Sequence, residues 1–107
     1  MKSALQALAD PTRREIFERI NDRPSAVGQL ADQLPISRPA VSQHLAVLKH
    51  AGLVCDVAKG TQRIYSVNRE GLVPLRVWLG QFWGEALAGF ADQVEIENQK
   101  KNKEADK

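Results

Sequence analysis

Residues 37–54 read SRPAVSQHLAVLKHAGLV and carry the start and stop signals of one helix. Ser37 is a favourable N-cap, and Pro39 falls early enough in the helix that its missing N–H costs little. Gly52 suits the left-handed backbone position that follows many helices. At about 100° per residue, three aliphatic side chains form one apolar stripe: Val41, Leu45 and Leu48. We therefore predict a helix that ends at Gly52 and buries this stripe.

The opposite face of this helix is polar and uncharged in its N-terminal half. Gln43 can pair with the edge of adenine, Ser42 can bond to several bases, and small side chains can meet a thymine methyl group. Long acidic side chains, which the phosphates of a duplex would repel, are absent from this face. A tight turn at residues 34–36 joins the helix to another short helix. This arrangement predicts a helix–turn–helix that reads the major groove.

Three further helices are predicted before this one. Residues 3–9 are strong helix formers, and Asp10-Pro11 provides an N-cap and a first helical residue for a second helix. Ser25 is expected to cap a third helix, whose apolar residues recur at i, i+3, i+4 and i+7. These residues are Val27, Leu30, Ala31 and Leu34.

After Gly52 the apolar pattern changes from helical to alternating. Residues 53–57 and 63–67 are rich in β-branched and aromatic side chains, and the intervening AKGTQ contains Gly60, which tolerates a positive φ. This pattern predicts a β-hairpin with a basic tip. Asn68 is then expected to cap a long C-terminal helix over about residues 69–98.

The predicted fold is mainly α with a small β-hairpin. Four helices, the hairpin and a fifth helix follow one another in the order of a winged helix–turn–helix. We expect residues 1–98 to form one DNA-binding and dimerisation domain, and residues 99–107 to form a disordered charged tail.

Composition excludes several classes of protein. The chain has 107 residues, of which 43% are apolar and 26% charged, as in ordinary globular domains. No apolar run approaches the roughly 20 residues of a membrane span, and the N-terminal residues do not resemble a secretory signal, so we expect a cytoplasmic protein without a membrane partner. Cys55 is the one cysteine. It is expected to be a small buried residue, with an intersubunit redox switch as the alternative.

The positive charge is concentrated around the predicted recognition helix. The net charge is only +2, but residues 37–76 contain six basic and two acidic side chains. A basic surface beside a helix–turn–helix favours a nucleic-acid partner.

Three stretches together resemble the ArsR/SmtB family of bacterial transcriptional repressors: LADPTRREIFERI, QLADQLPISRPAVSQHLAVLKHAGLV and KGTQRIYSVN. The resemblance covers about residues 4–68. It implies a homodimeric repressor of an operator in double-stranded DNA, with the fourth helix in the major groove and the hairpin as a wing. It assigns DNA contacts to Ser37, Arg38, Pro39, Ser42, Gln43 and His44 of the helix, and to Lys59, Thr61 and Arg63 of the wing. Arg13 and Arg14 are further candidates for phosphate contact, with a plain solvated face as the alternative.

Many members of that family release DNA when they bind a metal, but this sequence departs from their sites. One type of site needs a cysteine pair before the recognition helix, where this chain has VGQLADQL. Another uses histidines on the C-terminal helices, whereas here both histidines, His44 and His50, lie on the recognition helix and point roughly 120° apart. We therefore expect no metal and no cofactor. The resemblance is to the metal-independent branch, whose members often act as autorepressors or are controlled by another protein.

Apolar residues on the C-terminal helix exceed what one packing surface needs. Part of this surface is expected to cover the domain's own core, and the remainder predicts a homodimer. The expected interface contains Leu5, Leu8, Leu75, Trp78, Leu79, Phe82, Trp83 and Phe90.

The sequence also bears on two other classes of function. The modest charge and the apolar C-terminal helix are also compatible with a winged-helix module that binds protein and no DNA. An enzyme is not expected, because the sequence shows no paired catalytic carboxylates, no glycine-rich phosphate loop and no nucleophile motif.

Overall fold

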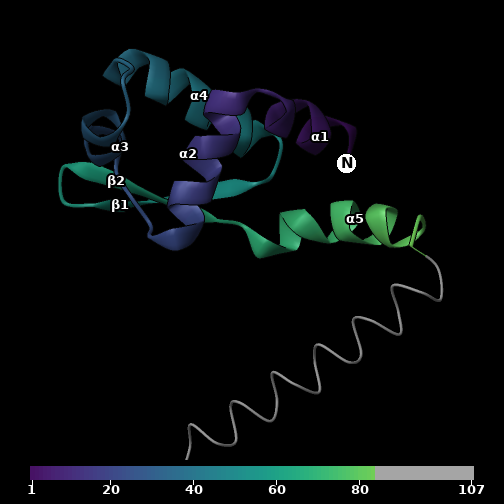
Figure 1. Ribbon diagram of the computed structural model, residues 1–107. Coiled ribbons are helices and arrows are strands. Elements are labelled where there is room, and N and C mark those ends of the chain that lie inside the picture. Colours follow the sequence, from purple (N-terminus) through teal and green to yellow (C-terminus); the bar gives the residue numbers. More distant parts are fainter. Residues whose placement is uncertain (84–107) are drawn as a thin grey trace, which may run out of the picture. The chain divides into compact units, whose positions relative to one another are not determined.

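The computed structural model describes residues 1–83 (Figure 1). Its elements are α1 (Lys2–Ala9), α2 (Pro11–Asp22), α3 (Val27–Gln33), α4 (Arg38–His50), β1 (Val54–Lys59), β2 (Gln62–Val67) and α5 (Arg69–Gly80). This order confirms the predicted winged helix–turn–helix. Three predictions lie outside the described residues: the end of the C-terminal helix, the role of Phe90 and the charged tail.

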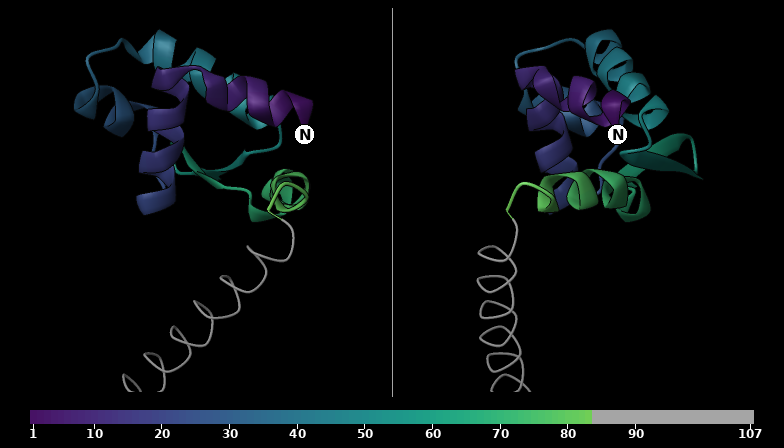
Figure 2. Two further views of the ribbon diagram at one scale, coloured as in Figure 1. Left: turned by 45° about the vertical axis from the view of Figure 1, so that its right-hand side comes forward. Right: turned by 90° about the vertical axis from the view of Figure 1, so that its right-hand side faces the viewer.

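Residues Met1–Leu75 form one compact unit with a single apolar core. Helix α2 contacts α1, α4 and β2, and Figures 1 and 2 show it crossing from α4 to the hairpin. The largest fully buried side chains are Ile16, Ile20, Leu30, Val41, Leu45, Leu48 and Leu53. Every helix of the helix–turn–helix therefore contributes to one core, which fixes α4 relative to the wing.

Asp10 caps α2 as predicted. Its Oδ1 accepts a hydrogen bond of 3.0 Å from the backbone N–H of Arg13. This bond, with smaller contributions from the charges of Arg13 and His44, holds the pKa of the Asp10 carboxyl below its ordinary value. The cap stabilises α2, which packs against α4.

The predicted cap of α3 is wrong by one residue. The N-cap is Ala26, whose N–H donates to Oε1 of Gln29 at 2.8 Å. Ser25 instead pairs with Tyr65 through two backbone hydrogen bonds, and its hydroxyl donates to the carbonyl oxygen of Arg23. Because the carbonyl oxygen of Ser25 accepts from Tyr65, the first hydrogen bond of the helix is accepted by Ala26 instead, from the N–H of Leu30.

The hairpin is longer and its loop shorter than predicted. Strands β1 and β2 are antiparallel and stay paired up to Lys59 and Gln62, which leaves Gly60 and Thr61 as the loop. Gly60 has a φ of 64° and Thr61 a negative φ, the combination found in type II′ turns. The tip of the wing is therefore a tight turn rather than a five-residue loop.

The start of α5 is fixed to the end of α4. Asn68 precedes α5 as predicted, but its side-chain amide donates to the carbonyl oxygen of Gly52 at 3.1 Å. Its backbone N–H donates to the carbonyl oxygen of Leu53 at 2.9 Å. Through these two bonds, Asn68 joins the start of α5 to the segment that follows α4.

Within residues 69–83, the C-terminal helix departs from regular α-helix before the point that the sequence predicts. Regular α-helix ends at Gly80, and the next three residues make i→i−3 hydrogen bonds. Glycine at this position lowers the helix propensity, so the tighter turn takes over. Among the helices within residues 1–83, none has both the length and the apolar character of a membrane span.

Candidate nucleic-acid interface

Helix α4 has the two faces that the sequence predicts. Val41, Leu45 and Leu48 each have 0% of their surface exposed, whereas Ser42 and Gln43 are exposed. The buried stripe holds the helix in one rotational setting against the core. The polar N-terminal half of its outer face is consequently presented to solvent.

Both ends of α4 are closed by the expected local motifs. The Ser37 hydroxyl accepts a hydrogen bond from the N–H of Ala40, and Pro39 lies in the first turn. At the other end Gly52 has a φ of 80°, its N–H donates to Lys49, and the N–H of Leu53 donates to Leu48. These two bonds form a Schellman motif, which ends the helix and directs the chain into β1.

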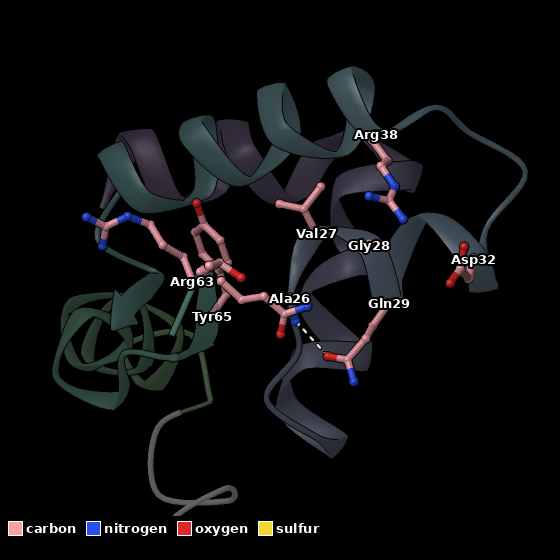
Figure 3. A pocket seen from close by; sticks show the side chains of 10 residues that line it. Ala26, Val27, Gly28, Gln29, Asp32, Arg38, Arg63 and Tyr65 are labelled. Atoms are coloured by element: carbon pink, nitrogen blue, oxygen red, sulfur yellow. Dashed lines mark hydrogen bonds between the residues drawn. The ribbon is translucent and has the colours of Figure 1, made fainter. Parts of the chain in front are cut away.

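Arg38 extends from the start of α4 over α3. A Cβ added at Gly28 would lie 3.2 Å from Nη2 of Arg38, so the absence of a side chain at Gly28 leaves room for the guanidinium. Figure 3 shows Arg38 near Gly28 and Asp32 at one end of a groove, with Arg63 and Tyr65 of the wing at the other. This groove connects the start of the recognition helix with the wing.

The candidate contacts on α4 differ in their exposure. Ser37, Arg38, Pro39, Ser42 and Gln43 are exposed, and they share the N-terminal half of the helix. His44 is half-buried. In the C-terminal half, Ala46, Val47 and His50 line a groove together with residues of α1.

The two histidines do not form part of a cluster of metal ligands. His44 is half-buried and His50 is exposed. Within residues 1–83 no group of three or more His, Cys, Asp or Glu side chains could hold a metal ion.

The register of the hairpin separates the candidate wing contacts. Arg63 pairs with Ala58, while Lys59 pairs with Gln62, the next position along. Since successive residues of a strand point to opposite faces, Arg63 and Lys59 lie on opposite faces of the wing. Thr61 is exposed at the tip between them. A duplex beside the wing would meet these side chains from different sides.

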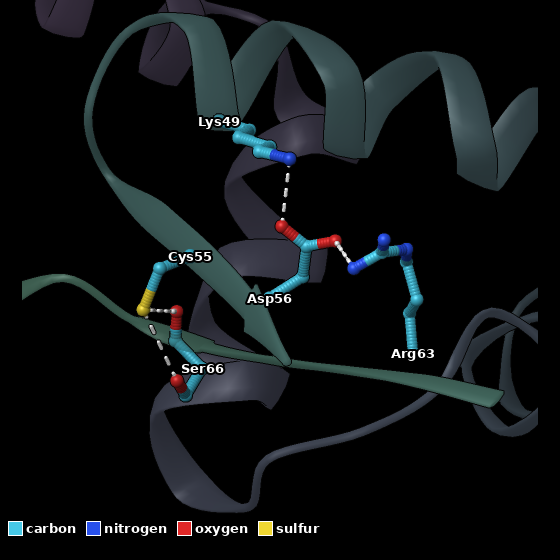
Figure 4. Close-up of polar contacts among 5 residues, drawn as sticks. All are labelled: Lys49, Cys55, Asp56, Arg63 and Ser66. Carbon is cyan, nitrogen blue, oxygen red and sulfur yellow. Dashed lines mark hydrogen bonds and ion pairs between the residues drawn. The ribbon is translucent and has the colours of Figure 1, made fainter. Parts of the chain in front are cut away.

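Arg63 forms an ion pair that the sequence did not predict. Its Nη1 lies 3.0 Å from Oδ2 of Asp56, and Nζ of Lys49 lies 2.7 Å from Oδ1 of the same carboxylate (Figure 4). The hydrogen bond from Lys49, together with both positive charges, lowers the pKa of Asp56 below its ordinary value. One carboxylate therefore connects α4 with both strands of the wing.

Lys49 and Asp56 are the residues that the candidate set missed. Asp56 is the one acidic residue between Ser37 and Arg69, and it shares a strand face with buried Val54. An acidic side chain on an inward-facing position needs a cationic partner. That alternation is the signal that could have indicated an ion pair here.

Cys55 is exposed, contrary to the predicted buried position. It occupies the strand face opposite to Val54 and Asp56, because side chains alternate along β1. Its Sγ lies 3.4 Å from the hydroxyl oxygen of Ser66 on the neighbouring strand. The burial prediction treated cysteine by its average behaviour and did not assign it to a face.

The remaining arginine candidates lie at the start of α2. The Nε–H of Arg13 donates to the carbonyl oxygen of Ala7 at 2.9 Å, so this side chain is held against α1. Arg14 is exposed. The structure therefore separates these neighbours, and Arg14 is the one whose side chain extends into solvent.

Comparisons with known proteins agree with this geometry. Residues 8–55 match the family described as a helix–turn–helix domain. The chain is 56% identical over 94 residues to the HTH-type transcriptional regulator Rv2034 of Mycobacterium tuberculosis, covering 88% of each chain. It is 34% identical over 82 residues to the transcriptional repressor SdpR of Bacillus subtilis, covering 77% of this chain and 91% of that one.

A solved structure also shares the fold. An ArsR-like transcriptional regulator from Rhodococcus sp. RHA1 aligns with a TM-score of 0.70 and 30% identity, covering 89% of this chain and 90% of that one. The aligned regions extend well beyond the helix–turn–helix itself. The chain therefore belongs to the ArsR/SmtB family of winged helix–turn–helix, DNA-binding transcriptional regulators.

Proposed function

We propose that the protein is a repressor that places the N-terminal half of α4 in the major groove of an operator. The observation that carries this proposal is the exposed, uncharged face of α4 opposite a fully buried aliphatic stripe. On this proposal Ser42 and Gln43 contact base edges, and Arg38 contacts the phosphate backbone. Family membership favours DNA over a protein-only partner and gives no support to an enzymatic role.

The wing would add contacts to the phosphate backbone of the DNA. Lys59 and Thr61 are exposed at its tip, and Arg63 is exposed while paired with Asp56. We propose that Lys59 and Thr61 contact phosphates directly, and that Arg63 does so from the other face of the hairpin. His44, being half-buried, would contribute mainly by supporting α4.

We also propose a homodimer formed through α1 and α5. Leu5 is exposed, whereas Leu8 packs partly against the protein's own core. Trp78 and Phe82 of α5 stack edge to face with their ring centres 4.9 Å apart. Phe82 and Trp83 are largely exposed, as are Val73, Val77 and Leu79. Apolar side chains of this number favour burial against a second copy.

The proposed regulator acts without a metal or cofactor in the cytoplasm. Its third helix lacks the cysteine pair of one type of metal sensor. Control by autorepression or by another protein is compatible with this composition. The proposed domain of residues 1–98 extends beyond the described residues, and the proposed tail of residues 99–107 lies wholly outside them.

The first test is a Gln43→Ala substitution. We expect it to weaken binding to a duplex that the parent enriches from a random-sequence pool by about 1–3 kcal/mol, and to relax the sequence preference at one position. Mobility shifts at physiological salt measure both effects. Gln6→Ala, at an exposed glutamine of α1, is the matched control and should bind like the parent. If the parent and Gln43→Ala bound this duplex with equal affinity, Gln43 would not be a base contact.

The second test concerns the dimer. Light scattering should give twice the chain mass of 11.9 kDa for the parent and a smaller mass for Phe82→Asp. Phe82 is 67% exposed, so this change should not disturb the core. Val57→Asp, at a wing residue that is 65% exposed, should remain dimeric. A parent that stayed monomeric at micromolar concentration would refute the homodimer.

A further inference from the structure

A nearly buried carboxylate lies beside the proposed DNA-binding surface. The side chain of Asp56 is 5% exposed, whereas those of its partners Lys49 and Arg63 are 55% and 60% exposed. The carboxylate is thus covered, and the side chains of Lys49 and Arg63 converge on it (Figure 4). An acidic group in this position is unexpected, because it lies close to a surface that is proposed to bind phosphates.

The geometry lets one carboxylate hold two elements together. Each oxygen of Asp56 has its own partner, Oδ1 the Nζ of Lys49 and Oδ2 the Nη1 of Arg63. Asp56 pairs with Tyr65 across the hairpin, so Arg63 is its diagonal neighbour on the same face. Lys49 comes from the last turn of α4. The ion pairs consequently fix the wing relative to the recognition helix.

The same contacts reduce the charge available to DNA. With Asp56 ionised, the three side chains carry a net charge of +1 instead of +2. Non-specific binding to a duplex depends almost wholly on such charges, whereas specific binding also needs base edges in register. A carboxylate that offsets one positive charge therefore weakens binding to DNA of any sequence. The fixed position of the wing preserves binding to the specific duplex, whose shape and bases fit the surface.

We propose that Asp56 is a specificity-determining positioning residue, which offsets the charge of Lys49 and Arg63 and sets the wing against α4. This inference rests on the proposed placement of the duplex along α4 and the wing. Its consequence is that removing the carboxylate strengthens non-specific binding and weakens discrimination.

The decisive variant is Asp56→Asn, which keeps the size of the side chain. The probes are the duplex that the parent enriches from a random-sequence pool and, as non-specific DNA, poly(dI-dC). We expect the salt dependence of poly(dI-dC) binding to steepen by about one unit, and the affinity at 0.15 M salt to rise about fivefold. The ratio of specific to non-specific affinity should fall by at least the same factor.

The matched control is Asp22→Asn, which removes an exposed acidic charge at the end of α2. It should leave the salt dependence and the affinity ratio of the parent unchanged, because Asp22 does not contact the two cations. An Asp56→Asn protein with the parent's salt dependence and affinity ratio would overturn the inference. A parent that bound neither probe would overturn the proposed function and this inference with it.

A second pair of variants decides the question if Asp56→Asn does not fold. Lys49→Met removes a cation that Asp56 already offsets, whereas Lys59→Met removes a cation with no ion pair within the described residues. We expect Lys59→Met to flatten the salt dependence by about one unit and Lys49→Met to flatten it by less. Equal flattening by the two variants would contradict the role of Asp56.

Discussion

Replacing Gly71 with alanine is expected to destabilise the protein by at least about 3 kcal/mol and to lower its melting temperature by more than about 10 °C. The added Cβ would overlap the carbonyl oxygen of Gly52 and lie 2.7 Å from its carbonyl carbon. Both atoms belong to the backbone, so no side-chain rotation can relieve the clash. Thermal and urea unfolding followed by circular dichroism measure the effect.

The surrounding hydrogen bonds make the clash costly to relieve. The Gly52 oxygen that the new Cβ would meet also accepts from the side chain of Asn68, whose own N–H donates to Leu53. Moving the start of α5 away from Gly52 would stretch both bonds. Moving Gly52 instead would disturb the Schellman motif that ends α4.

Gly80→Ala is the matched control for Gly71→Ala, because both glycines belong to α5. A Cβ at Gly80 meets no atom within 4 Å among residues 1–83. This variant should be as stable as the parent or more stable, since alanine favours a helix by up to about 1 kcal/mol over glycine. If Gly71→Ala were as stable as Gly80→Ala, the close approach of Gly71 to Gly52 would be wrong.

The parts of the fold predicted from the sequence are those that local signals determine. The ends of α4 follow from a cap at Ser37 and a left-handed glycine at Gly52, which act within a few residues. The rotational setting of α4 follows from the spacing of Val41, Leu45 and Leu48, since only one side of the helix can be buried. These features place Ser42 and Gln43 on the outside without any knowledge of distant contacts.

The errors occur where a distant segment competes with a local preference. Ser25 is a good N-cap by itself, but its backbone pairs with Tyr65, forty residues later in the chain. Cys55 has the average behaviour of a buried residue, yet the alternation that buries Val54 turns it outward. A propensity for one residue cannot include such pairing, which depends on the register of the hairpin.

The candidate site was incomplete for the same reason. The sequence identifies Arg63 as a cation of the wing. Its ion pair with Asp56 depends on the strand register, and the ion pair of Asp56 with Lys49 depends on the position of α4. An ion pair between residues 49, 56 and 63 leaves no periodic pattern. The sequence therefore identified the cations that face solvent and missed the carboxylate that holds two of them.

Replacing Leu45 with alanine is expected to destabilise the protein by about 2–5 kcal/mol. Leu45 has 0% of its surface exposed at the centre of the stripe that seats α4, so the change would leave a cavity in the core. Domains of this size have a total stability of roughly 5–10 kcal/mol, so the loss is a large part of the whole. Urea unfolding, analysed by linear extrapolation, measures it.

Val47→Ala is the control for Leu45→Ala, because it shortens an exposed side chain of the same helix and so measures the effect of truncation without loss of burial. Val47 lies two residues further along α4 and is 41% exposed, so its truncation should change stability by less than about 0.5 kcal/mol. At a temperature where the Leu45→Ala protein remains folded, it should keep the parent's sequence preference, because Ser42 and Gln43 are unchanged. A Leu45→Ala protein as stable as Val47→Ala would show that the stripe does not hold α4. A changed sequence preference would show that the setting of α4, and with it the base contacts, depends on this one side chain.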